Sequence, residues 1–178
     1  MEDGHPAQPL PGAGIPIIAL GGDITLYWVG GSAGYLSQLY LDVLGNQVVF
    51  SNDGSPQLNR TISGVPAGTE LVFRIVVDGG RHTWYSGPAS RNVDGVVHAA
   101  VCDWLPDTTV SSSGKFVGFE DWPGDPAAPR AFIENAGNGD FNDLMFVIHQ
   151  EVPEPSTVLL VVSALGAFAV FSRRARIR

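Results

Sequence analysis

Short apolar segments alternate with turn residues along most of the chain, and this pattern limits what it can fold into. Glycine occurs 22 times and proline 13 times in 178 residues, and both interrupt helices. Segments rich in β-branched and aromatic residues end at turn signals such as Gly30-Gly31 and Asp78-Gly79. No amphipathic helix is evident in this part of the chain. We therefore expect an all-β fold over residues 23–150, an antiparallel β-sandwich of jelly-roll-like type.

The segments expected to form strands share β-branched or aromatic side chains and lie at residues 24–29, 35–43, 47–50, 70–77, 96–101, 115–120 and 144–149. Before them, the Pro/Gly-rich residues 1–22 are expected to form a flexible leader. Met1 is followed by acidic residues and lacks the basic start of a signal peptide. We therefore expect the true start to lie upstream of it, and the alternative is a cytoplasmic protein with a chance tail.

The charge is distributed unevenly. Up to Gln150 the sequence holds 16 acidic and 6 basic residues, and four arginines after residue 172 supply the remaining basic charge. An acidic body argues against nucleic acid as a partner, because phosphates are neutralised by Lys and Arg. It is compatible with simple solubility or with divalent cations. The single cysteine, Cys102, cannot form an internal disulfide.

An uncharged run precedes the arginine-rich end RRARIR. The 17 residues from Ser156 to Ser172 carry no charge, and as a helix they would extend about 25 Å. This approaches the hydrocarbon core of a bilayer, about 30 Å. VLLVVSALGAFAVF has no polar face, which argues against a buried helix. We expect one C-terminal transmembrane helix at residues 158–172, after a hinge at 151–157, with a basic cytoplasmic tip at 173–178.

The same stretch resembles a known sorting signal. VPEPST, an apolar helix and an arginine-rich end, in this order, are similar to the PEP-CTERM signal of Gram-negative bacteria. The resemblance implies transient anchoring in the inner membrane with the body in the periplasm, processing by an exosortase, and release to the cell surface or extracellular matrix. It also implies an association with exopolysaccharide and biofilm. The sorting residues would be Val152, Pro153, Glu154, Pro155, Ser156, Arg173 and Arg174.

Oxygen-bearing side chains gather in two motifs, FEDW at 119–122 and NGDFNDLMF at 138–146. Calcium binds six to eight oxygen ligands from carboxylates, amides, carbonyls and water. If the two motifs lie at the ends of adjacent strands, their carboxylates converge, and without a cation they would repel each other. The alternative is turn chemistry, because Asn and Asp also cap turns. The candidate ligands are Glu120, Asp121, Asp140, Asn142 and Asp143.

A second resemblance rests on these motifs. VGFEDWPGD followed by GNGDFNDLMFVI looks like the "FED … DxDYND" pattern of a bacterial extracellular domain family of unassigned function, over about residues 24–148. The resemblance implies that calcium is the cofactor of the acidic motifs. Asp94 and His98, in NVDGVVHA, are expected either to support such a site or to be structural.

These features predict a non-enzymatic, exported surface or matrix protein, stabilised by calcium. The sequence contains no GxSxG, HExxH or P-loop motif. One alternative is a carbohydrate-binding module that uses exposed tryptophans and binds an extracellular polysaccharide. The other is a glycan-active hydrolase with a pair of carboxylates such as Glu120 and Asp143 in a cleft.

Overall fold

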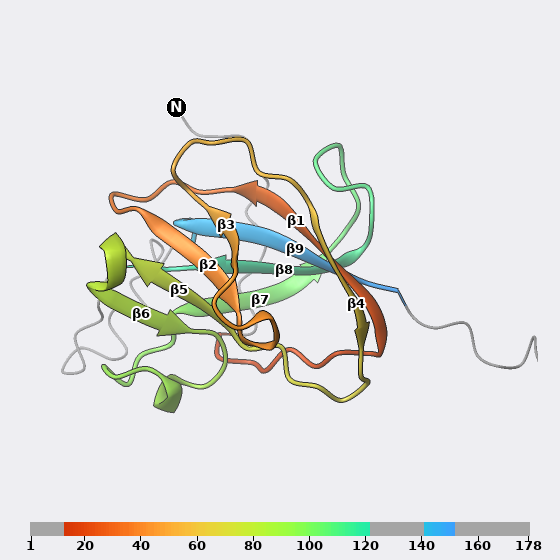
Figure 1. The fold of residues 1–178 in the computed structure, drawn as a ribbon, viewed down its shortest axis with the longest axis horizontal. Helices are drawn as coiled ribbons and strands as arrows, with labels where there is room; N and C mark the ends of the chain where they lie inside the picture. The colour runs from red at the N-terminus through yellow and green to blue at the C-terminus, as the bar shows by residue number, and fades with distance from the viewer. Residues whose placement is uncertain (1–12, 122–140, 152–178) are drawn as a thin grey trace, which may run out of the picture.

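The protein forms two antiparallel β-sheets, seen in a computed structural model that describes residues 13–121 and 141–151 (Figure 1). The five-stranded sheet has the order β4 (Arg60–Val65), β1 (Gly22–Gly30), β9 (Leu144–Gln150), β8 (Gly114–Phe119), β7 (Ala99–Trp104). The four-stranded sheet has the order β3 (Val48–Ser51), β2 (Ser37–Leu41), β5 (Phe73–Val77), β6 (His82–Tyr85).

The prediction of an antiparallel all-β fold is confirmed, and every paired strand is antiparallel. The strand order differs from the predicted jelly-roll-like type. A jelly roll has eight strands in two Greek keys, whereas here β7, β8 and β9 are consecutive neighbours in the five-stranded sheet, and the described residues form nine strands. The helical elements among the described residues are three short 3-10 turns, η1 (Asp42–Leu44), η2 (Asp78–Gly80) and η3 (Ala89–Arg91).

One hydrophobic core lies between the two sheets. Strands of the five-stranded sheet contribute Ile24, Leu26 and Phe146, and strands of the other sheet contribute Leu39 and Phe73. These side chains recur at every second position, as expected where one face of a strand is buried. The rings of Phe73 and Phe146 lie 4.8 Å apart across the core. Contact between inner faces therefore joins the sheets.

The segment before β1 differs from the predicted leader. Ile17 and Ala19 are buried in the core. Their backbone pairs with the chain before β5, through Leu71 N–H to the Ile17 carbonyl at 2.8 Å and Ala19 N–H to the Thr69 carbonyl at 2.8 Å. The Pro/Gly content hid this pairing, because an edge segment held by a few backbone hydrogen bonds needs no strand-like run. Residues 13–22 thus belong to the sandwich.

Two strands had no sequence prediction, β4 and β6. In β4 the side chains are mostly exposed, and Val65 is its buried residue. In β6, four residues long, Trp84 is the buried residue. Neither strand has the apolar alternation on which the prediction depended.

The expected membrane helix lies outside the described residues, as do all seven predicted sorting residues. Within residues 13–121 and 141–151, no helix has the length and apolar character needed to cross a bilayer.

The packing predicts a large effect of Phe146→Ala. Phe146 is fully buried and contacts both Phe73 and Phe50, so its loss leaves a cavity between the sheets. We expect the free energy of unfolding to fall by about 3–5 kcal/mol, measured by urea denaturation. Leu58→Ala, at a side chain that is 78% exposed, is the control and should change it by less than about 0.5 kcal/mol. Equal effects of the two substitutions would contradict this account of the core.

Candidate cation site

Three carboxylates meet where β8 ends and β9 begins. Glu120 and Asp121 follow Phe119, the last residue of β8, and Asp143 precedes Leu144, the first residue of β9. Because Phe119 and Leu144 are paired in the sheet, the flanking residues lie at the same sheet end. One oxygen from each of the three carboxylates lies within 4.8 Å of the others. Asp121 and Asp143 are buried, and Glu120 is half-buried.

Hydrogen bonds tie this cluster to both sheets. The Asp121 N–H donates to Oδ2 of Asp143 at 2.7 Å, which bridges the two acidic motifs. Oδ2 of Asp121 accepts from the Ser37 hydroxyl at 3.1 Å, and the Asp121 carbonyl accepts from the Trp84 indole at 2.9 Å. Ser37 is in β2 and Trp84 in β6, both in the four-stranded sheet. Asp121 therefore links the end of one sheet to two strands of the other.

Two glycines allow the Asp143 segment to lie this close to its neighbours. A Cβ at Gly118 would come within 2.1 Å of the Phe141 carbonyl oxygen, and a Cβ at Gly31 within 2.6 Å of the Asp143 carbonyl oxygen. No side chain fits at either distance, so glycine is required at both positions. Phe141 has φ of +36°, a left-handed conformation that is unusual for an aromatic residue. The backbone is therefore strained two residues before Asp143, and such strain is common at functional sites.

The surroundings of Asp121 favour its protonated form. Burial, and after it the charge of Asp143, raises the pKa of Asp121 to about 6. The hydrogen bond from Ser37 acts in the opposite direction but does not cancel this rise. A buried carboxylate beside a second carboxylate holds its proton more tightly, because the doubly ionised state is destabilised.

Asp94 and His98 lie beside the cluster. The His98 ring nitrogens lie 2.8 Å from Oδ2 of Asp94 and 3.0 Å from the Glu120 carbonyl oxygen. The ring is 1% exposed and stacks on Trp84, with ring centroids 4.0 Å apart. The pair therefore supports the backbone of Glu120 and the ring of Trp84.

The structure brings together three of the five candidate ligands. Asp140 lies outside the described residues. Asn142 is half-buried next to Asp143, and its carbonyl accepts from the Ser32 N–H at 2.9 Å.

Four other residues at the site were missed by the sequence reasoning: Ser37, Asn52, His82 and Trp84. Asn52 donates to the Asp143 carbonyl at 3.3 Å and accepts from the Ser37 N–H at 2.7 Å. All four come from the four-stranded sheet or its loops. No local motif marks them, because their proximity to the carboxylates depends on how the two sheets face each other.

The geometry of the three carboxylates fits a calcium ion. Calcium–oxygen distances are about 2.3–2.6 Å, so two ligands of one ion lie at most about 5 Å apart. The three oxygens, within 4.8 Å of one another, meet this limit. Calcium takes six to eight oxygens, and water would supply those that the protein does not.

The raised pKa of Asp121 predicts that, without metal, the wild type loses stability with rising pH through this group and the amide variant does not. The folded state holds the Asp121 proton up to about pH 6, whereas the ordinary value is 3.8. The contribution of this group to stability therefore falls as pH rises from about 4 to about 6. Asp121→Asn keeps an acceptor for Ser37 and removes the charge. We expect the variant to gain about 1–3 kcal/mol relative to the wild type over this range, measured by urea unfolding in EDTA.

Asp103→Asn is the matched control, because the Asp103 side chain is 81% exposed. Its difference from the wild type should stay nearly constant over the same pH range. If Asp121→Asn behaved like this control, the two buried carboxylates would not be electrostatically coupled as described.

Comparison with known proteins finds a match for the C-terminal residues of the chain and none for the β-sandwich. The family model described as the PEP-CTERM protein-sorting motif matches residues 151–176. No curated protein and no solved structure matches the chain. The resemblance of residues 24–148 to a calcium-associated extracellular family finds no support in these comparisons. The chain carries a PEP-CTERM sorting motif, which implies an exported protein processed by exosortase, a membrane enzyme.

Proposed function

We propose that this is a non-enzymatic protein of the cell surface or extracellular matrix whose β-sandwich is stabilised by calcium at Glu120, Asp121 and Asp143. The observation that carries the proposal is the convergence of these carboxylates within 4.8 Å in a protein with an export motif. A cation would compensate the repulsion that raises the pKa of Asp121.

The proposed sorting route rests on the order of three segments at the C-terminus: the hinge, the apolar run and the arginine-rich end. The apolar residues 158–172 hold the protein in the inner membrane, with the body in the periplasm and the arginines at 173–178 in the cytoplasm. The exosortase then acts near Pro153-Glu154-Pro155, and the body reaches the surface or matrix. An association with exopolysaccharide and biofilm remains part of the proposal and rests on the sorting motif alone.

Calcium would act on stability through linkage. It binds the folded arrangement of Glu120, Asp121 and Asp143, which the unfolded chain does not hold in place. Binding stabilises the native state by about 2.7 kcal/mol at a hundred times the dissociation constant. Because Asp121 is bonded to Ser37 and Trp84, this stabilisation acts on the contact between the two sheets.

The two alternative functions receive less support. A sugar-binding face would need exposed, coplanar tryptophans, but Trp84 is 2% exposed and Trp104 is 9% exposed. Trp28 packs against the core and Phe50, and Trp122 lies outside the described residues. A glycosidase needs two carboxylates on opposite sides of a sugar, about 5–10 Å apart. Glu120 and Asp143 instead converge with Asp121 on one point.

The calcium proposal predicts a metal-dependent melting temperature. For the protein spanning residues 13–151, calcium at a hundred times its dissociation constant should raise the melting temperature by several degrees over EDTA. Asp143→Asn keeps an acceptor for the Asp121 N–H but loses a charged ligand, so this rise should disappear. Asp103→Asn should retain the full rise. Identical melting temperatures of the wild type in calcium and EDTA would mean that the acidic residues cap turns and do not bind calcium.

The sorting proposal predicts a processing defect when Pro153, Glu154 and Pro155 are replaced by alanine. In cells that produce an exosortase, the wild-type protein should convert to a shorter, released form. The triple variant should remain full-length in the membrane fraction, because the recognised hinge is lost while the apolar run is intact. Leu58→Ala, an exposed change in the body, should be processed normally. Release of the triple variant at the wild-type rate would contradict the proposed route.

A further inference from the structure

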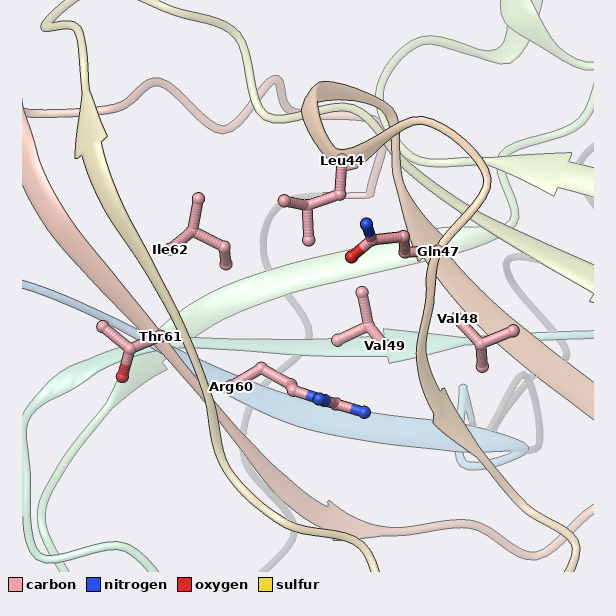
Figure 2. Close-up of a pocket in the computed structure, with 7 residues that line it drawn as sticks. All are labelled: Leu44, Gln47, Val48, Val49, Arg60, Thr61 and Ile62. Atoms are coloured by element: carbon pink, nitrogen blue, oxygen red, sulfur yellow. The ribbon is translucent and has the colours of Figure 1, made fainter.

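A groove opens at the side of the sandwich opposite the edge strands β6 and β7. It lies between β3 and β4, the edge strands of the two sheets, and has a volume of about 420 Å³. Figure 2 shows β4 contributing Arg60, Thr61 and Ile62 on one side, and β3 with the turn before it contributing Val49, Leu44 and Gln47 on the other. This volume is in the range of ligand sites, about 300–1,000 Å³.

The floor of the groove is apolar. Val49 is buried in the main core, and Leu44 and Ile62 pack against that core. Leu44 and Ile62 are half-buried, so part of their hydrocarbon surface stays open to the groove, and Val49 lies beneath it at 4% exposure. Thr61 and Gln47 add a hydroxyl and an amide at the exposed part of the groove.

Arg60, which lines this groove, differs from the other described cations in its ion pairing. Of the five Lys and Arg residues that the structure describes, four form ion pairs with a carboxylate: Arg74 with Asp42, Arg81 with Asp78, Arg91 with Glu70, and Lys115 with Asp103. Arg60 forms none with any described residue. Arg60 is exposed, so its guanidinium is accessible to a solute, although carboxylates outnumber cations in the body. Its side chain lies along the groove between β4 and β3 (Figure 2).

We propose that this groove binds a small organic anion, whose carboxylate pairs with Arg60 and whose apolar body lies against Leu44, Val49 and Ile62. Arginine matches a carboxylate with two parallel N–H donors, which gives both charge and orientation. The apolar floor selects for a hydrocarbon part and disfavours inorganic ions. The site is independent of the calcium proposal, since it shares no residue with Glu120, Asp121 or Asp143.

Matched small molecules test the charge and the apolar part separately. The full-length, ¹⁵N-labelled protein is titrated with N-acetyl-leucine, N-acetyl-leucinamide and N-acetylglycine, and the Val49 and Thr61 amide shifts are followed. N-acetyl-leucine should give saturable shifts. The neutral amide and the glycine derivative should each bind about tenfold more weakly, the loss expected for one charge-assisted hydrogen bond or one buried aliphatic side chain.

Arg60→Gln should bind N-acetyl-leucine about tenfold more weakly and no longer distinguish it from N-acetyl-leucinamide. Arg81→Gln removes a cation outside the groove whose side chain is 60% exposed, and it should leave binding unchanged. Thermal melts check that both variants are folded. Shifts that do not saturate, or equal affinity of the wild type and Arg60→Gln, would overturn the proposal.

Discussion

The hydrogen bond from the Asp121 amide to the Asp143 carboxylate is the contact on which the site end of the sandwich depends. It joins the residues that leave β8 and enter β9 at 2.7 Å. Asp121 then extends this contact to the second sheet through Ser37 and the Trp84 indole. The bond to Asp143 thus connects the start of β9 to the residue that contacts β2 and β6. Gly31 and Gly118 make the arrangement possible by leaving room for the Asp143 segment.

Hydrogen bonds and charge have opposite effects on the ionisation of these carboxylates. The Asp121 N–H and the Ser37 hydroxyl donate to the two buried carboxylates, which favours their ionised forms. Burial and mutual repulsion outweigh these donors at Asp121, whose pKa rises to about 6. Above about pH 6, ionisation of Asp121 in the folded protein therefore costs stability. Under the calcium proposal, a bound divalent cation would offset this cost.

The sequence predicted most of the fold because the strands carry local patterns. The residues of β1, β5 and β9 alternate between the core and the opposite face, and turn residues mark their ends. Strands β4 and β6 escaped prediction, since a polar edge strand and a four-residue strand have little apolar pattern. Ile17 and Ala19 were assigned to a leader because their burial depends on pairing with residues near Thr69, far along the chain.

For the site, too, the sequence predicted only the residues that local patterns mark. Glu120, Asp121 and Asp143 could be identified because each flanks an apolar strand, and paired strand ends bring flanking residues together. Ser37, Asn52 and Trp84 could not, because they reach the carboxylates from the other sheet. The unpaired state of Arg60 was also beyond the sequence, since it depends on which carboxylates lie near each cation in the fold.

Calorimetry of calcium binding at two pH values tests whether Asp121 is a calcium ligand. If calcium binds at Asp121, it must displace the proton that the raised pKa retains, and buffers of different ionisation enthalpy report the number released. From a pKa of about 6, we predict the release of about three-quarters of a proton per calcium at about pH 5.5 and almost none at about pH 8. Binding without proton release at the lower pH, or no binding at either pH, would show that Asp121 is not a calcium ligand.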